Sequence, residues 1–376
     1  MRIRSGLRAR VVILGPGLAA LSGVSTHVNM LLASDLGLHF ELLHFRVGSE
    51  GRTENAIQKL MRLCVSPFQL ALFLVKSRVD IVHLNTSLDA KAYWRDLAYL
   101  VVAKLLRRSV VNQVHGGPNP SDFFPRSALL TWVLRQFLVR SDAVTVLSRG
   151  EFAAYATFDS RIKIYLVPNA IDSSGLIDEP RSVNSHEPLR LVYVGRIIES
   201  KGLFDIVAAL RQLRQQGRRF TFSVAGTGRD ETRLREAIRA AGLEDCIRLL
   251  GGVVGVAKSS LWLESDVFVF PTRQEGLPYA LLEAMAAGCV PVVTPVGAIP
   301  DVLQSDLEGF LVAASDIARV VAALEELDDD RPKLAHMAHC ARRRIAEYYT
   351  LRRLAADFDA IYRRVLQAAS SWQQWQ

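Results

Sequence analysis

The sequence predicts an α/β fold that consists of two doubly wound, Rossmann-like domains. Short runs of apolar, branched residues alternate with amphipathic helical patterns, which is typical of a parallel sheet with helices on both faces. This alternation stops once, at residues 173–188, and then restarts. The chain has 376 residues, of which 50% are hydrophobic, and this is sufficient for two cores.

The first domain is predicted over residues 1–172. Its strand-like runs are bounded by glycine or polar residues and lie at 11–14, 39–45, 80–84, 109–115, 143–147 and 163–167. Helical patterns connect them at 24–36, 56–77, 92–106, 128–140 and 150–157. Pro67 is expected to interrupt the second of these patterns, because proline breaks the backbone hydrogen bonds of a helix.

A linker is predicted at residues 173–188, which are rich in Ser, Asp, Glu and Pro and lack apolar periodicity. The second domain is predicted over residues 189–348. Its strands fall at 189–194, 220–225, 247–250, 266–270 and 290–294, and its helices at 203–216, 231–241, 279–287 and 331–349. A last helical pattern, 351–367, lies within the final segment 349–376.

The charge of the chain is uneven. Residues 1–180 contain 21 Lys and Arg against 14 Asp and Glu, whereas residues 181–376 contain 25 against 24. A basic amino-terminal half favours an anionic partner, which includes a membrane surface, a nucleic acid or a phosphate-bearing acceptor. Solvated arginines on an ordinary basic protein are the alternative.

The four cysteines show no paired or metal-ligand spacing, which predicts free thiols in a reducing compartment. The basic start of the chain lacks the apolar length and the cleavage site of a signal peptide. The longest apolar run, 68–75, is far shorter than the ~20 residues that a membrane span needs. We therefore expect a cytoplasmic protein that is soluble or peripheral on a membrane.

Glu275 and Glu283 stand eight positions apart beside a predicted crevice. Glu275 follows strand 266–270 at its carboxyl end, where open α/β sheets bind ligands. Glu283 lies on helix 279–287, about two turns further on at roughly 3.6 residues per turn, so both side chains can reach one site. Two solvated carboxylates near a helix start are the alternative.

A basic glycine loop, residues 195–202, follows strand 189–194 and opens a helix. Backbone amides and the positive end of a helix dipole suit a phosphate at such a place. Arg196 and Lys201 add two cations, and fixed cations can neutralise a diphosphate leaving group without a metal. A basic surface turn is the alternative interpretation.

Further strand-end turns point to the same crevice. They contain Gly226, Gly251, Gly252, Val253 and the segment 297–301. Each of these turns alone is a weak signal. Their order along the chain, one after each strand, favours a common binding site.

The amino-terminal half carries three further signals. Gly17 and Gly23 lie between the first strand and its helix, but the spacing is not a Gly-x-Gly-x2-Gly fingerprint, which disfavours dinucleotide binding. His115 ends strand 109–115 before a tight Gly-Gly turn, so we expect its side chain to point into the crevice. His27, one turn into the helix, is expected to be packed.

Two basic segments allow two interpretations each. Lys91 and Arg95 lie four positions apart on one helix, where they suit an acceptor phosphate or form a solvated face beside Asp96. Residues 59–78 mix apolar and basic side chains, which fits packing on the sheet and also contact with an anionic membrane. The acidic triplet at 328–330 is predicted to be a loop and a helix start, without a metal.

These motifs together resemble the retaining, nucleotide-sugar-dependent glycosyltransferases of the family-4 type. The resemblance rests on Pro-Thr-x2-Glu-Gly-Leu-Pro at 271–278, Glu-Ala-Met-Ala-x-Gly at 283–288 and Gly-Arg-x4-Lys-Gly at 195–202. It covers almost the whole chain and is most specific over residues 189–312. It implies a GT-B-type fold with a crevice between the domains, and a terminal helix, within 349–376, that crosses back to the first domain.

The resemblance also implies roles for single residues. Those implied in catalysis are His115, Arg196, Lys201 and Glu275. Those implied in donor binding are Gly195, Arg196, Lys201, Gly226, Val253, Glu275, Gly276, Leu277 and Glu283, with Glu283 on the ribose and Val253 beside the base. Gly17, Gly23, Lys91 and Arg95 are expected near the acceptor. No metal and no cofactor besides the nucleotide sugar are expected.

The implied reaction moves a hexosyl unit, with retention, from a nucleotide diphosphate sugar to a glycan or lipid-pyrophosphate-linked acceptor in cell-surface polysaccharide biosynthesis. Together with the basic first half, it favours an acceptor at the inner face of a membrane and no nucleic acid partner. A nucleotide-sugar epimerase of similar fold and a non-catalytic nucleotide-sugar-binding protein are the alternatives. The motifs leave the nucleobase, the sugar and the acceptor open.

Overall fold

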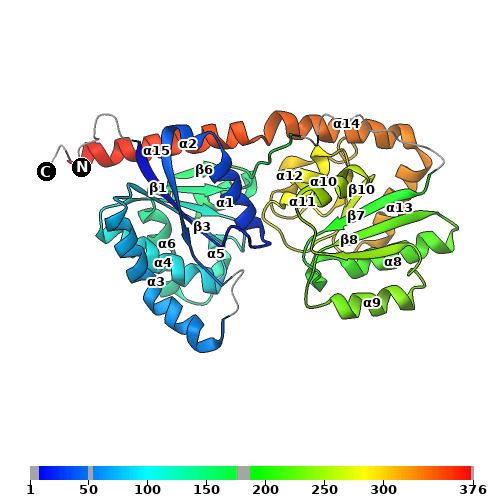
Figure 1. The fold of residues 1–376 in the computed structure, drawn as a ribbon, viewed down its shortest axis with the longest axis horizontal. Helices are drawn as coiled ribbons and strands as arrows, with labels where there is room; N and C mark the ends of the chain where they lie inside the picture. The colour runs from blue at the N-terminus through cyan, green and yellow to red at the C-terminus, as the bar shows by residue number, and fades with distance from the viewer. Residues whose placement is uncertain (1–7, 50–53, 175, 177–186, 374–376) are drawn as a thin grey trace. The chain divides into compact units, whose positions relative to one another are not determined.

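The computed structural model describes residues 8–49, 54–174, 176 and 187–373. The chain divides into two compact units (Figure 1): unit 1 is Met1–Ala170 with Leu351–Gln376, and unit 2 is Ile171–Thr350. Each unit contains a six-stranded sheet covered by helices, which confirms the predicted α/β class with two doubly wound domains. Most of the predicted linker, residues 173–188, lies outside the described residues.

The sheet of unit 1 has the strand order β2-β1-β3-β4-β5-β6, and every neighbouring pair is parallel. Its strands are β1 (Ala9–Gly15), β2 (Phe40–Arg46), β3 (Ile81–Thr86), β4 (Ser109–Val114), β5 (Ala143–Val146) and β6 (Ile164–Leu166). Strands β3, β4 and β5 are buried along their whole length, as expected for the centre of a sheet covered on both faces.

Helices cover both faces of this sheet (Figure 1). One face carries α3 (Ala56–Lys76), α4 (Ala90–Leu105), α6 (Ala128–Arg140) and α7 (Arg149–Phe158), with the short α5 (Pro120–Phe123) beside them. The other face carries α1 (Gly23–Ala33), α2 (Leu36–His39) and α15 (Leu351–Gln373). Each face therefore has its own hydrophobic core: the first lies beneath α3, α4, α6 and α7, and the second beneath α1, α2 and α15. Because successive strand residues point to opposite faces, Val12 packs in the first core and Val11 in the second.

The terminal helix α15 packs in unit 1, although the whole of unit 2, residues 171–350, separates it in sequence from the rest of that unit. Its inward side is formed by Leu354, Phe358, Ile361, Tyr362 and Val365, which are all buried against β1 and α1 residues. Their spacing places them on one face of a helix. This apolar stripe therefore closes the second core of unit 1.

The sheet of unit 2 has the order β12-β11-β10-β7-β8-β9 and is also parallel. Its strands are β7 (Leu189–Val194), β8 (Phe220–Ala225), β9 (Ile247–Gly251), β10 (Val267–Phe270), β11 (Val290–Val293) and β12 (Phe310–Leu311). Its helices are α8 (Leu203–Gln215), α9 (Glu231–Ala240), α10 (Gly255–Leu263), α11 (Tyr279–Ala286), α12 (Ile299–Val302), α13 (Ile317–Asp329) and α14 (Arg331–Tyr348). The sequence analysis did not predict α10, α12, α13 or β12.

The prediction that Pro67 interrupts its helix was wrong, since α3 continues through this residue. Ser66, Leu70 and Leu74 are buried against unit 1 on both sides of the proline. This packing stabilises the turns that the missing proline N–H weakens. The predicted helix 24–36 is likewise two helices, because α1 ends at Ala33 before α2 begins.

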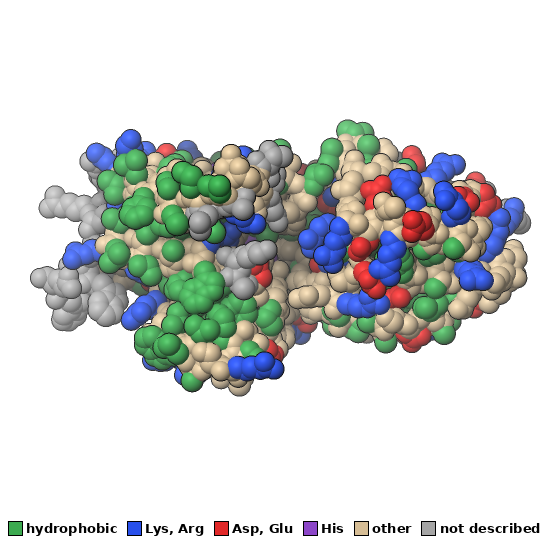
Figure 2. Space-filling view, turned by 90° about the horizontal axis from the view of Figure 1, so that it is seen from below, with side chains coloured by type: hydrophobic (Ala, Val, Ile, Leu, Met, Phe, Trp, Pro, Cys, Tyr) green, Lys and Arg blue, Asp and Glu red, His purple; other side chains and the backbone are tan. Residues whose placement is uncertain are grey.

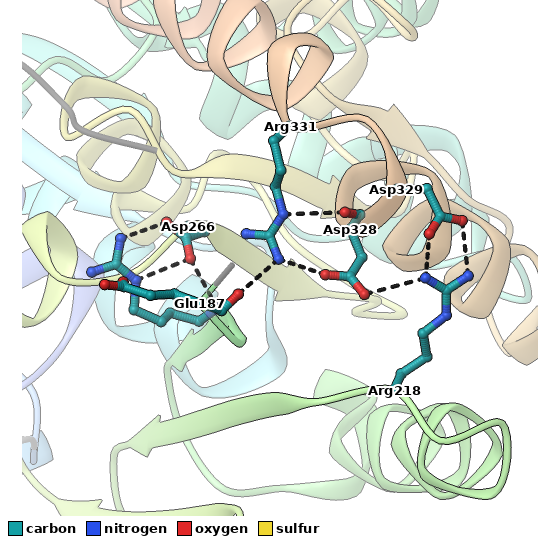
Figure 3. Close-up of polar contacts among 7 residues, drawn as sticks. Glu187, Arg218, Asp266, Asp328, Asp329 and Arg331 are labelled. Carbon is teal, nitrogen blue, oxygen red and sulfur yellow. Dashed lines mark hydrogen bonds and ion pairs between the residues drawn. The ribbon is translucent and has the colours of Figure 1, made fainter. Parts of the chain in front are cut away.

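The acidic triplet takes part in ion pairs, which Figure 3 shows, and in a helix cap. Arg331 donates to the Asp328 carboxylate at 2.5 Å, and Arg218 binds both Asp328 at 3.3 Å and Asp329 at 2.8 Å. Asp330 caps α14, as predicted for a helix start. Asp328 and Asp329 are the last residues of α13, so the prediction of a loop was wrong for them.

Candidate functional site

The loops that follow β7 and β8 in unit 2 are hydrogen-bonded to each other. Parallel strands end at one edge of their sheet, so their loops meet there. The Gly195 N–H donates to the Ala225 carbonyl at 3.0 Å, and the Ile197 N–H donates to the Thr227 carbonyl at 2.9 Å. The basic loop 195–202 is therefore held by the backbone of its neighbour.

Two predicted glycine positions allow these loops to come this close. Gly226 has a φ of +147°, and a Cβ there would lie 1.8 Å from the Gly195 carbonyl oxygen. Gly297 has a φ of +58°, and a Cβ there would lie 2.2 Å from the Glu275 carbonyl oxygen. Only glycine fits such positions. They bring the loops after β7, β8, β10 and β11 together around Glu275.

Lys201 and Glu275 form an ion pair at the centre of these loops. The Lys201 ammonium also donates to the Gln274 carbonyl at 3.0 Å and lies 5.8 Å from the centre of the Phe270 ring. Lys201 is only 8% exposed. Burial raises the pKa of Glu275 above its usual range, and the positive charge of Lys201 opposes that rise. The pair thus fixes the carboxylate in a partly desolvated place.

Arg196 differs from Lys201 because its side chain is exposed and forms no ion pair in the described part of the chain. Its backbone is fixed, since its carbonyl accepts a hydrogen bond from the Tyr193 hydroxyl at 2.7 Å. Its charge is close enough to Glu275 to lower the pKa of that carboxyl group. The loop therefore holds one paired cation and one cation open to a ligand.

Glu283 on α11 is held by two residues that the sequence analysis missed. Lys258 donates to its carboxylate at 2.6 Å, and the Trp262 indole N–H donates at 3.1 Å. Lys258 and Trp262 lie four positions apart on α10, hence on one side of that helix. Val253 lies in the loop between β9 and α10. Gly276 and Leu277 lie between Glu275 and the start of α11.

In unit 1, His115 follows directly after β4 and bonds to Asn85 on β3. The His115 Nε2 and the Asn85 Oδ1 are 2.7 Å apart, and Asn85 Nδ2 donates to the Leu14 carbonyl at 2.9 Å. Because a carbonyl only accepts, the amide orientation is fixed, and His115 Nε2 must be the donor. Burial lowers the pKa of His115 to about 3. The neutral ring thus carries its lone pair on Nδ1.

His115 belongs to a group of three histidines. The ring centres of His27 and His115 are 4.8 Å apart, and those of His27 and His83 are 6.5 Å apart. His83 Nδ1 lies 2.6 Å from the hydroxyl of Tyr362 on α15, and its Nε2 lies 3.1 Å from Gln113 Oε1. Burial lowers the pKa of His27, and it lowers that of His83 to about 4. His27 is buried, as expected from the sequence.

Unit 1 also contains a cavity of about 650 Å³ between α3, α4 and the ends of β1 and β3. Two residues adjacent to the predicted Gly17 and Gly23, namely Pro16 and Val24, line it. Arg95 lines it too, and its guanidinium is bonded to the buried Asp96 at 2.7 and 2.9 Å. Lys91 lies in the first turn of α4.

Comparisons with known proteins agree with this division into two units. Residues 177–344 match the family model of glycosyl transferases group 1, and residues 23–174 match the model of Glycosyltransferase Family 4. The putative colanic acid biosynthesis glycosyltransferase WcaL of Escherichia coli K12 is 35% identical over 44% of this chain. That match spans 43% of WcaL, less than half of its length.

A second relative aligns over more of the chain. The GDP-mannose:cellobiosyl-diphosphopolyprenol alpha-mannosyltransferase of Xanthomonas campestris is 26% identical over 70% of this chain and 70% of its own. Among solved structures, sucrose-phosphate synthase from Thermosynechococcus elongatus has a TM-score of 0.78 at 16% identity, covering 96% of this chain and 100% of that one. That likeness concerns the fold. With two family models that together span most of the chain, and with this fold, the chain belongs to the GT-B glycosyltransferases of the family-4 type.

Proposed function

We propose that the protein is a retaining glycosyltransferase that moves a hexosyl unit from a nucleotide diphosphate sugar to a glycan or lipid-pyrophosphate-linked acceptor. The observation that carries this proposal is the buried Lys201–Glu275 pair with the exposed Arg196 beside it. The name of the Xanthomonas relative mentions GDP-mannose as donor and a cellobiosyl-diphosphopolyprenol as acceptor. This name supports the proposed donor and acceptor classes. The name of WcaL supports a place in polysaccharide biosynthesis.

The two cations of the basic loop, Arg196 and Lys201, would both bind the leaving diphosphate, each in a different way. Arg196 would bind the phosphate oxygens, because its guanidinium is open to a ligand. Two of the three Lys201 ammonium hydrogens are used by Glu275 and Gln274, which leaves one for the donor. Both charges would stabilise the negative charge that develops as the sugar–phosphate bond breaks. This arrangement supports a metal-independent reaction.

The state of the two carboxylates supports front-face substitution. Glu275 accepts from Lys201, and Glu283 accepts from Lys258 and Trp262, so neither carboxylate is poised as a covalent nucleophile. In front-face substitution the bond from C1 to the phosphate oxygen breaks, and the acceptor oxygen bonds C1 on the same side. The departing phosphate oxygen takes the acceptor's proton. The product keeps the anomeric configuration of the donor.

His115 would orient a hydroxyl group of the sugar or of the acceptor. Its ring is neutral, and Asn85 occupies the N–H at Nε2, so Nδ1 can accept a hydrogen bond from that hydroxyl. The unit 1 cavity would receive the acceptor, with Arg95 and Trp94 in its lining. The aromatic ring suits a sugar face, and the Nη1 group of Arg95, which does not bond to Asp96, suits a phosphate.

The proposal is tested by nucleotide release from UDP-, GDP- and ADP-sugars in the presence of EDTA, with and without a lipid extract of host membranes. We expect release from one donor, increased by the lipid extract, and an NMR spectrum of the product with the donor's anomeric configuration. Arg196→Ala should lower turnover at least about a hundredfold. Arg235→Ala, an exposed arginine on α9 paired with Glu231, should leave turnover unchanged.

Three results would contradict the proposal in different ways. Tight nucleotide binding without release from any donor would indicate a binding protein. Conversion of the free nucleotide sugar without an acceptor would indicate an epimerase. Loss of release in EDTA would contradict the metal-independent reaction.

A further inference from the structure

The outer face of the α3–α4–α6 layer is apolar although it is exposed to solvent. We define this outer face by its exposed large hydrophobic residues: Ile57, Met61, Val65, Phe68, Leu72 and Val75 on α3, Trp94, Val101 and Leu105 on α4, and Leu129 and Trp132 on α6. Phe68 and Leu105 are 76% and 77% exposed. A surface this rich in apolar side chains usually marks an interaction site.

The three helices form one continuous surface. α3 packs against α4, and α4 and α6 together line an apolar groove of about 370 Å³ that includes Val101, Leu105 and Trp132. Figure 2 shows hydrophobic side chains gathered over unit 1, whereas basic and acidic side chains are mixed over the same side of unit 2. Among the described residues of unit 2, the exposed large hydrophobics are Leu250, Val254, Val256 and Tyr348.

The charge of the three helices is mainly positive, although Arg62, Lys104 and Arg135 form ion pairs with Glu54, Asp142 and Asp159 outside them. Together they contain eight Lys and Arg and a single acidic residue, Asp96, which is 2% exposed and bonded to Arg95. Lys76 and Arg140 end two of the helices, are exposed and form no ion pair within the described residues. The outer face is therefore apolar with a basic margin, which fits an anionic partner.

Helix α3 is held along the surface of unit 1. It is long and apolar enough to cross a membrane, with a 20-residue window of mean hydropathy 1.2. However, Leu70 and Leu74 are buried in the core beneath the helix, and Ser66 accepts a hydrogen bond from the Tyr99 hydroxyl at 3.0 Å. Phe68 and Leu72 point to the other side. One stripe of α3 thus packs on the protein and the opposite stripe is left for a partner.

We propose that the outer face docks on the surface of an anionic lipid bilayer, with its apolar side chains at the acyl boundary and its cations at the headgroups. Apolar residues, a basic margin and two exposed tryptophans, Trp94 and Trp132, are the combination that a bilayer interface binds. A second copy of this chain fits less well, because the cations of two such faces would oppose each other.

Docking would also bring the cavity of unit 1 to the lipid. Leu63, Pro67 and Trp94 line the cavity, and Trp94 belongs to the outer face as well. An acceptor whose lipid stays in the bilayer could then place its sugar in the cavity. This last step rests on the proposed function, whereas the docking itself does not.

The chain carries a natural position for a reporter of docking. Cys64 is exposed on α3 between Leu63 and Val65, whereas the other three cysteines are buried. An environment-sensitive nitrobenzoxadiazole maleimide should therefore label Cys64 alone. We expect its fluorescence to increase and shift to the blue with phosphatidylglycerol-containing vesicles. It should respond little to vesicles of phosphatidylcholine alone, and high salt should weaken the response.

Matched variants separate the outer face from the rest of unit 1. Phe68→Asp with Leu72→Asp should weaken vesicle binding at least about tenfold. Lys76→Glu with Arg140→Glu should weaken binding to anionic vesicles by a similar factor. Leu38→Asp, equally exposed but on α2 at the opposite face of the sheet, should leave binding unchanged. The altered residues are on the surface, so melting curves should show the fold retained in all three.

Four outcomes would overturn the proposal. The first is a wild-type protein that binds no vesicle, and the second is equal loss of binding in the Leu38→Asp control. The third is a dimer that Phe68→Asp with Leu72→Asp separates without affecting vesicle binding, which would make the outer face a contact between copies. The fourth is resistance of the membrane-bound protein to alkaline carbonate, which would indicate a spanning helix. The assay uses no donor and no acceptor, so its failure would leave the transfer reaction untouched.

Discussion

Lys201 and Glu275 stabilise each other in a part of unit 2 to which water has little access. Removal of one partner from a buried ion pair destabilises the fold more than replacement of both partners by apolar residues. The reason is that the single removal leaves the other charge buried and unpaired. The same pair is proposed to position the donor. Stability and turnover should therefore respond differently to single and double substitutions.

Lys201→Ala and Glu275→Ala should each lower turnover at least about a hundredfold, since each removes a contact to the donor. Lys201→Ala should also lower the melting temperature. The double variant Lys201→Met with Glu275→Leu should recover much of the stability and none of the turnover. Melting curves and nucleotide release on the same preparations measure both. Near-normal turnover of the two single variants would remove these residues from the site.

Asn85 determines which nitrogen of His115 carries the proton. Asn85→Asp would place a carboxylate beside the ring, which raises the pKa of His115 and keeps it protonated at higher pH. A protonated ring cannot accept at Nδ1. Turnover of this variant should therefore be low at neutral pH and rise as the pH rises. An unchanged shape of the pH–rate profile would refute the proposed role of Nδ1.

The partners of the site residues were harder to predict than the site residues themselves. Glu275 and Lys201 lie in sequence motifs, but Asn85 lies 30 positions before His115 and reaches it only because β3 and β4 are neighbouring parallel strands. Sequence patterns place both residues near strand ends. They do not give the register between the strands, and the register decides which side chains meet.

At the level of elements, α1, β3, β4 and α15 meet at His27, His83 and His115. All three have lowered pKa values in the folded chain, whereas unfolded histidines take up protons near pH 6.5. Below that pH the unfolded state binds more protons than the native state, so the stability of unit 1 falls as the pH falls.

The hydrogen-exchange protection of β3 and β4 amides, corrected for intrinsic rates, should therefore decrease from pH 7 to pH 5. His83→Gln removes one buried neutral imidazole. It should therefore lower the number of protons taken up on unfolding by about one, which makes the dependence of protection on pH shallower. His339→Gln, at an exposed position on α14, should not alter it. A pH-independent protection in the wild-type protein would contradict the assignment of these rings as buried and neutral.

The element that the sequence analysis missed most consequentially is α10. It has nine residues, contains two serines and begins at Gly255 with a φ of +59°. A short helix with this composition has a weak apolar period, and its formation depends on the burial of Leu261 and Trp262 in unit 2. Without α10, neither Lys258 nor Trp262 could be assigned to Glu283.

For the whole molecule, the alternation of strands and helices was sufficient to predict both sheets except for the short edge strand β12. It was not sufficient to predict the outer face of unit 1. The side chains of α3 itself are apolar on nearly all sides of the helix. Its sequence therefore fits packing on the sheet and contact with lipid equally well. Only the burial of Leu70 and Leu74 identifies the side that packs and, by exclusion, the side that is presented.

The return of α15 to unit 1 has a consequence for how the chain matures on the ribosome. Unit 1 is interrupted by the whole of unit 2, residues 171–350, so the stripe that covers Val11 and Ile13 is synthesised only after unit 2. At 5 to 20 residues per second, this leaves that core uncovered for about 10 to 40 seconds of translation. Unit 2, although second in the sequence, is therefore the first part of the chain able to complete its folding. The nascent first half needs protection from aggregation until the final helix emerges.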